Sequence, residues 1–192
     1  MKIMDSINFE MLRPQWPELA TLGGFAEQYA HPDAASSLIK QRTFCENLVA
    51  VIYQAHNLSF PQYDSLFELL TEQTFKDAVP KSVLDKLHLL RINGNDAAHG
   101  KPVQSETALS CLREAWDLGR WFFVAYGNGN PGDCTEYREP SPVDPTETLT
   151  KEKQAALRTI EAQETQLQEL LQQVETLRAP ASTPERTEAE RP

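Results

Sequence analysis

The sequence predicts an all-α protein in which a bundle of four or five helices precedes an irregular linker and one long C-terminal amphipathic helix. Apolar residues recur three and four positions apart from Pro17 to Tyr126, which is the spacing of helices with one buried face. Gly and Pro residues then crowd the chain, and a heptad pattern of apolar residues follows them. We therefore expect four parts: a helical bundle at 1–126, a linker at 127–148, an amphipathic helix at 149–178 and a disordered tail at 179–192.

The first half of the bundle is expected to hold two helices. Pro14 and Pro17 open the first one, because proline is tolerated in the first turn of a helix. Its Gly23-Gly24 pair weakens the helix intrinsically and so suggests that a neighbour packs closely there. Asp33 is a suitable N-cap for a long second helix, and Asn57 is expected to close it.

The second half of the bundle begins with a short helix around residues 66–70, after which residues 75–79 are expected to form a small turn. Pro80 is placed to open the next helix, which runs into the segment from Arg91 to Gly100. After Pro102 breaks the chain, Ser105 or Thr107 can cap the last long helix of the bundle.

The amphipathic helix at 149–178 is expected to be a partner surface. A lone helix cannot bury its own apolar stripe, so this one would pack on another protein, on its own bundle, or on a second copy through residues 156–177. The seam residues are Ile160, Leu167, Leu170, Val174 and Leu177.

Composition excludes several classes of protein. The formal net charge of −10 argues against a general nucleic-acid coat, because phosphate backbones require an excess of Lys and Arg. Apolar runs are far shorter than the roughly 20 residues that span a bilayer, and the first residues lack a secretory signal, so we expect a cytoplasmic protein. Three scattered cysteines and four histidines without zinc-ligand spacing predict no disulfides and no metal site. Cys45 and Cys111 and the three tryptophans are expected to belong to the core.

The segment from Arg91 to Lys101 is the most informative one. It resembles a phosphate-binding loop only superficially, because five residues separate its glycines and Pro102 replaces the Ser or Thr that would bind magnesium. Arg91 and His99 could instead serve ribonuclease chemistry if Gly94 bends the helix and brings them onto one surface. The alternative, which we favour, is structural: both side chains bind carbonyls and carboxylates, such as Asp96 and Glu106, and fasten the helix junction.

Four segments together resemble a known family: residues 8–20, 33–53, 89–100 and 108–126. They are similar to the N-terminal helical domain of the R (HsdR) subunit of type I restriction enzymes. A related domain of unassigned function occurs alone or fused to other prokaryotic defence proteins. The most specific part of the resemblance is an R-x-x-G-N-x-A-x-H core, made here by Arg91, Gly94, Asn95, Ala97 and His99.

The resemblance implies an accessory role rather than catalysis. In the family, a magnesium-requiring nuclease domain cleaves DNA and an ATP-driven motor translocates it, and both lie beyond the matched region. This sequence contains neither a Walker A motif nor a nuclease cluster, so no cofactor is expected in this chain. We expect a fragment that contacts the remainder of the R subunit and the modification and specificity subunits, and that meets DNA only through the complex.

A second resemblance supports a different function. The bundle is also similar to HEPN-like prokaryotic helical bundles that bind or cut RNA and carry an Arg…His motif. There the spacing between the two residues is usually four to six, whereas seven residues separate Arg91 from His99. The alternative function is therefore a stand-alone RNA-binding or RNA-cleaving defence protein that uses Arg91 and His99.

Overall fold

The computed structural model describes residues 4–60, 65–127, 129–142 and 166 of the 192-residue chain. The chain divides into two units, Met1–Pro142 and Val143–Pro192. Within its described residues the first unit is all-helical and holds no strand. Its described residues form six α-helices: α1 (Pro17–Tyr29), α2 (Ala34–Ala55), α3 (Leu66–Thr71), α4 (Gln73–Ala78), α5 (Lys81–Ala98) and α6 (Ser105–Tyr126). Short 3-10 turns lie at Glu10–Leu12 and Pro131–Asp133.

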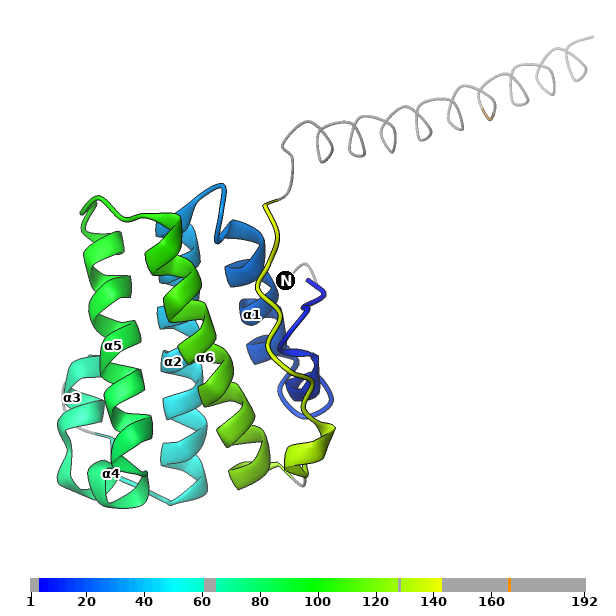
Figure 1. Cartoon of the computed structure of the whole chain (residues 1–192). Coiled ribbons are helices and arrows are strands. Elements are labelled where there is room, and N and C mark those ends of the chain that lie inside the picture. The colour runs from blue at the N-terminus through cyan, green and yellow to red at the C-terminus, as the bar shows by residue number, and fades with distance from the viewer. Residues whose placement is uncertain (1–3, 61–64, 128, 143–165, 167–192) are drawn as a thin grey trace, which may run out of the picture. The chain divides into compact units, whose positions relative to one another are not determined.

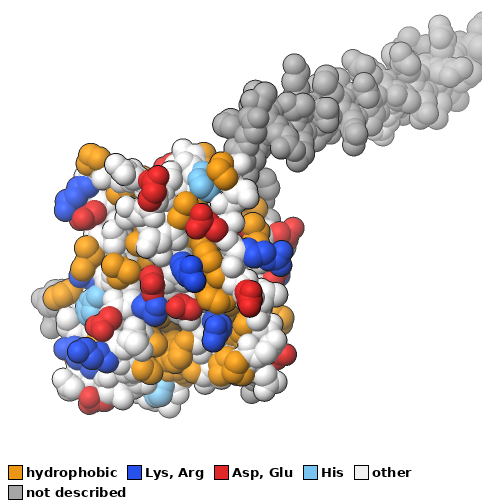
Figure 2. All heavy atoms as spheres, in the orientation of Figure 1, with side chains coloured by type: hydrophobic (Ala, Val, Ile, Leu, Met, Phe, Trp, Pro, Cys, Tyr) orange, Lys and Arg blue, Asp and Glu red, His pale blue; other side chains and the backbone are white. Residues whose placement is uncertain are grey.

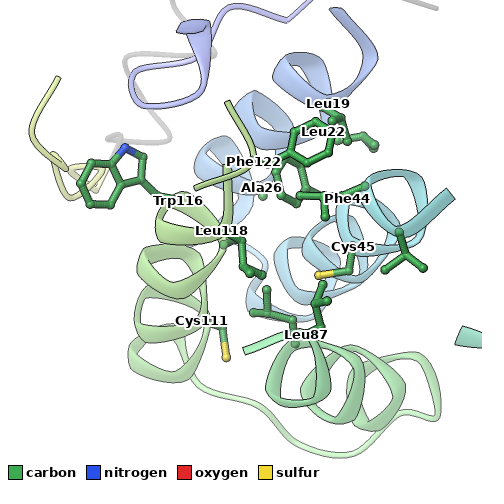
Figure 3. Packing of buried hydrophobic residues seen from close by; sticks show 14 of the residues in the cluster. Leu19, Leu22, Ala26, Phe44, Cys45, Leu87, Cys111, Trp116, Leu118 and Phe122 are labelled. Atoms are coloured by element: carbon green, nitrogen blue, oxygen red, sulfur yellow. The ribbon is translucent and has the colours of Figure 1, made fainter. Parts of the chain in front are cut away.

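Helix α2 is the centre of the bundle, since α1, α5 and α6 all pack against it (Figure 1). Its apolar stripe is fully buried and includes Phe44, Cys45 and Leu48. The close-up in Figure 3 shows Phe44 and Cys45 with Leu87 of α5 and Leu118 of α6 in one cluster. The three-and-four spacing of the sequence therefore identified the buried faces of the long helices correctly.

Local signals at the two ends of α2 are confirmed. The Asp33 carboxylate accepts a hydrogen bond of 3.0 Å from the backbone N–H of Ser36, as an N-cap should. At the other end Asn57 adopts a left-handed φ of 51°, and the N–H of Leu58 donates to the Tyr53 carbonyl at 2.9 Å. This backward bond satisfies a carbonyl that the end of the helix leaves free.

The Gly23-Gly24 pair of α1 packs closely against a neighbour, as expected. A methyl group at Gly23 would overlap the Phe9 ring, and one at Gly24 would lie 2.6 Å from the Asp5 carbonyl oxygen. The two glycines lower the helix propensity of α1, but they allow close contact with the N-terminal segment.

Two expectations about helices are wrong. Residues 73–78 form the separate helix α4, not a small turn, and its Phe75 is fully buried against the bundle. Neither Ser105 nor Thr107 caps α6: its N-cap is Gln104, which makes no side-chain cap bond. The Ser105 hydroxyl instead donates to the His31 carbonyl at 3.2 Å, so a tertiary contact took the place of the local one.

Residues 129–142, expected to be part of a linker, are irregular and pack against the bundle. Asn8 exchanges two hydrogen bonds of 2.8 Å with the backbone of Arg138, and a ring nitrogen of His31 lies 2.7 Å from the Pro140 carbonyl oxygen. The first unit consequently extends to Pro142, beyond the expected boundary at Tyr126.

The expected C-terminal helix at 149–178, its seam residues Ile160, Leu167, Leu170, Val174 and Leu177, and the tail at 179–192 lie outside the described residues. Among the helices that are described, none combines the length and apolar character that crossing a membrane requires.

Candidate interaction surface on helix α5

The sequence motif from Arg91 to His99 lies on α5, which runs without interruption through Gly94 to Ala98. The expectation that Gly94 relaxes or bends the helix is therefore not met. A methyl group at Gly94 would lie 2.5 Å from Cβ of Arg42 and 3.0 Å from the carbonyl oxygen of Leu38. Gly94 thus lets α2 and α5 approach closely, and Ala97, which is also buried, lies one turn further along.

The end of the motif terminates the helix. His99 is the C-cap of α5, and Gly100 adopts a φ of +74°, a conformation that favours glycine. The N–H of Lys101 then donates to the Asp96 carbonyl at 3.0 Å, which closes the helix in the same manner as at Asn57. Gly94, Ala97 and Gly100 consequently have structural reasons for their identity.

The structure does not bring Arg91 and His99 together. Eight residues along a continuous α-helix amount to about 12 Å of rise. Cζ of Arg91 lies 5.1 Å from the centroid of the Phe67 ring of α3, while His99 is exposed at the opposite end of the motif. Asn95 is half-buried one turn from each of them, so the three residues follow one ridge of α5 without facing a common point.

The hydrogen bonds of this segment also differ from those that the structural interpretation predicted for Arg91 and His99. Asp96 pairs with Lys101 at 2.7 Å, and within the described residues neither Arg91 nor His99 donates from its side chain to Asp96 or Glu106. The Nε atom of Arg91 is buried and has no hydrogen-bond partner there. A buried guanidinium donor without an acceptor is costly, which makes Arg91 a candidate for binding another molecule.

Large apolar side chains are exposed on α3 and α5, and one of them, Phe67, contacts Arg91. The exposed fractions are 52% for Phe67 of α3, 41% for Leu89 and 49% for Ile92. Leu89 and Ile92 are three positions apart and so are neighbours on α5. We call Phe67, Leu89, Arg91 and Ile92 the α5 surface. Aromatic residues and arginine are enriched in the centres of protein interfaces, so this composition is typical of a protein contact.

One further titratable side chain, His88, lies close to Arg91. His88 is half-buried one turn before Ile92. Burial lowers the pKa of His88, and the nearby Arg91 guanidinium lowers it further. Arg91 is the cation of the α5 surface, because an arginine side chain keeps its charge at neutral pH.

Nucleophilic and metal-ligating groups do not gather in the part of the chain that the structure describes. No group of three His, Cys, Asp or Glu residues there could hold a metal ion. Cys45 and Cys111 are buried in the core as expected, and burial raises the pKa of both thiols, that of Cys111 to about 11. Such thiols stay protonated and are poor nucleophiles.

The sequence reasoning missed a second group of residues, on α6. Arg113, Trp116 and Arg120 share one face of that helix and border a cleft with Cys134 and Tyr137. Trp116 is a core residue, as expected, because only 7% of it is exposed, yet its indole N–H finds no acceptor in the described structure. The spacing of three and four residues between Arg113, Trp116 and Arg120 was the available signal.

Comparisons with protein-family models, with curated proteins and with solved structures found no match to this chain. The similarity to the R subunit of type I restriction enzymes accordingly stays a prediction from sequence, and the geometry of the α5 surface is what bears on function.

Proposed function

We propose that this chain is a non-catalytic interaction module, the N-terminal accessory module of the R subunit of a type I restriction endonuclease. It docks through the α5 surface on the remainder of that subunit or on the modification and specificity subunits. The ATP-dependent and magnesium-requiring steps belong to domains outside this chain. The observation that carries the proposal is the exposure of Phe67, Leu89 and Ile92 on α3 and α5, together with an Arg91 guanidinium whose Nε lacks an acceptor.

The physical argument rests on what these side chains gain from a partner. Ile92 and Leu89 leave about half of their surface in water, and covering an apolar side chain of this size stabilises a complex by about 1–2 kcal/mol. The Phe67 ring already holds Arg91 in place by a cation–π contact. An acceptor on the partner would then meet an ordered donor, so binding orders few additional side chains.

The test is binding of the full chain to the other subunits, measured by calorimetry or by co-elution. Replacing Ile92 with lysine places a charge in the proposed contact and is expected to weaken binding at least tenfold. The matched control is Ile7→Lys, because Ile7 is also 49% exposed and lies on the N-terminal segment. If Ile92→Lys binds as tightly as the parent chain, or if the parent chain binds none of these subunits, the proposal fails.

The ribonuclease alternative has less support. It needs the Arg91 and His99 side chains at one phosphate, whereas about 12 Å of helix separates the two positions and Arg91 rests on Phe67. The predicted self-association through residues 156–177 lies outside the described residues.

A further inference from the structure

A polar cleft of about 410 Å³ lies between α6 and the irregular segment that follows it. The α6 side contributes Arg113, Trp116 and Arg120, which are three and four positions apart and so share one face. Cys134 and Tyr137 border the other side. The volume is that of a small-molecule site, and the cleft is unrelated to the α5 surface of the proposed function.

Each of the two arginines lies against an aromatic ring. Cζ of Arg113 lies 5.7 Å from the centroid of the Tyr137 ring, and Cζ of Arg120 lies 5.6 Å from that of the Trp116 ring. The two rings are neighbours, with centroids 5.6 Å apart. A ring against the face of a guanidinium leaves the N–H groups at its edge free to bind an anion.

Two acidic side chains, Asp117 and Glu136, border the cleft beside the two arginines. Asp117 is bound to Lys86 at 3.2 Å, a lysine that also pairs with Glu114, whereas Glu136 is exposed to solvent. In the part of the chain that the structure describes, neither Arg113 nor Arg120 forms an ion pair. Figure 2 shows basic and acidic side chains mixed over α5 and α6 on this face of the molecule.

Two buried polar atoms at the cleft have no partner among the described residues. Trp116 is 93% buried, since only 7% of it is exposed, and its Nε1 atom makes no hydrogen bond. Figure 3 shows its indole at the edge of the core cluster, apart from the other labelled side chains. The Tyr137 hydroxyl also lacks a partner, and burial raises the pKa of this phenol to about 12, so it keeps its proton. An indole N–H can only donate, so an acceptor is the missing group.

We propose that this cleft binds the phosphate group of a small phosphate-bearing molecule, with Arg113 and Arg120 as its cations and the Trp116 N–H as a buried donor. A phosphate group has three or more oxygens and accepts from several directions, which suits donors arriving from both arginines and from the indole. A carboxylate offers only two oxygens. The ligand is small because the cleft is small; free phosphate and a phosphate ester are the two sources to distinguish.

The indole N–H of Trp116 gives a direct readout. The full chain, labelled with ¹⁵N, is titrated with inorganic phosphate and with adenosine monophosphate at constant ionic strength, and its three tryptophan side-chain signals are followed by NMR. A Trp116→Phe variant identifies the Trp116 signal. A saturable downfield shift of that signal with either probe is the expected result, and a response to the ester alone identifies the ester as the source.

Variants show whether the arginines carry the binding. The double variant Arg113→Gln/Arg120→Gln is expected to weaken phosphate binding at least tenfold. Lys40→Gln is the matched control and should leave binding unchanged. Lys40 is likewise a cation resting on an aromatic ring, 5.7 Å from the centroid of Phe25, but it lies on α2. Both arginines are exposed, so the fold should be retained, and unchanged helical circular dichroism would verify it.

Alkylation of Cys134 with neutral iodoacetamide provides a second measurement. Cys134 is half-buried at the cleft, whereas Cys45 and Cys111 are buried in the core. Bound phosphate should slow the alkylation of Cys134 severalfold. The proposal is overturned if the Trp116 signal does not saturate with either probe, if the double variant binds as well as the parent chain, or if only an acidic peptide shifts the signal.

Discussion

Gly94→Ala is the substitution that best separates close packing from a helix hinge as the role of this glycine. In an ordinary helix position the change would stabilise the protein by about 1 kcal/mol, because alanine has the higher helix propensity. Here the added methyl group would lie 2.5 Å from Cβ of Arg42 and 3.0 Å from the Leu38 carbonyl oxygen. Both atoms belong to or adjoin the backbone of α2, so relief requires the two helices to separate.

The magnitude follows from these two opposed effects. Overpacking a well-packed contact costs about 1–3 kcal/mol, and a contact as short as this one belongs at the upper end. The net expectation for Gly94→Ala is a loss of about 2 kcal/mol in the free energy of unfolding. For a domain of this size that loss lowers the melting temperature by about 4–8 °C.

Urea unfolding followed by circular dichroism measures the loss directly. Gly132→Ala is the control, because nothing lies within 4 Å of a methyl group added there, and it should change the stability by less than about 0.5 kcal/mol. A Gly94→Ala variant as stable as the parent chain, or more stable, would refute the close-packing argument and return Gly94 to the role of a hinge.

Three further expectations concern polar contacts. Asn8→Ala removes the hydrogen bonds that hold Arg138 and should cost about 2–3 kcal/mol; trypsin should then cut after Arg138 faster, and an unchanged cleavage rate would contradict this. Burial raises the pKa of Glu27 above its ordinary value of 4.5, so its contribution to stability is present below pH 4.5 and is lost as the pH rises through the folded-state pKa. The free energy of unfolding of Glu27→Gln, relative to that of the parent chain, should therefore increase as the pH rises. A relative stability that decreases as the pH rises would be incompatible with the raised pKa. Lys86→Met leaves the carboxylate of Glu114 without its cation and should cost about 0.5–1 kcal/mol, less in high salt; equal losses at both salt concentrations would show that charge is not the cause.

Features that depend on neighbours in sequence were predictable. Asp33 caps α2 through the N–H of Ser36, three residues away, and Asn57 ends the same helix by its own left-handed conformation. Both effects act within one turn of helix, so composition and spacing reveal them.

Features that depend on distant residues were not predictable in this way. Ser105 binds the carbonyl of His31 and not the start of its own helix. The docking of residues 129–142 depends on the Asn8–Arg138 bonds between opposite ends of the unit. The role of Gly94 depends on Arg42 of another helix, and a hinge and a close contact leave the same glycine in the sequence.

The candidate sites illustrate the same limit. The motif from Arg91 to His99 was visible in the sequence, but the separation of its two ends follows only once α5 is known to be continuous. The sequence did not reveal the cleft at Trp116, because a tryptophan among apolar neighbours is typical of a core. The neighbouring residues in the sequence do not indicate that its indole N–H lacks an acceptor.

Hydrogen–deuterium exchange of the full chain, alone and with the other subunits of a type I restriction enzyme, tests the proposed docking most directly. We predict that the partner slows exchange in α3 (Leu66–Thr71) and α5 (Lys81–Ala98), the two helices that carry Phe67, Leu89, Arg91 and Ile92. Exchange that stays unchanged in both helices while the partner is bound, or protection confined to α1, would contradict the assignment of the α5 surface as the contact.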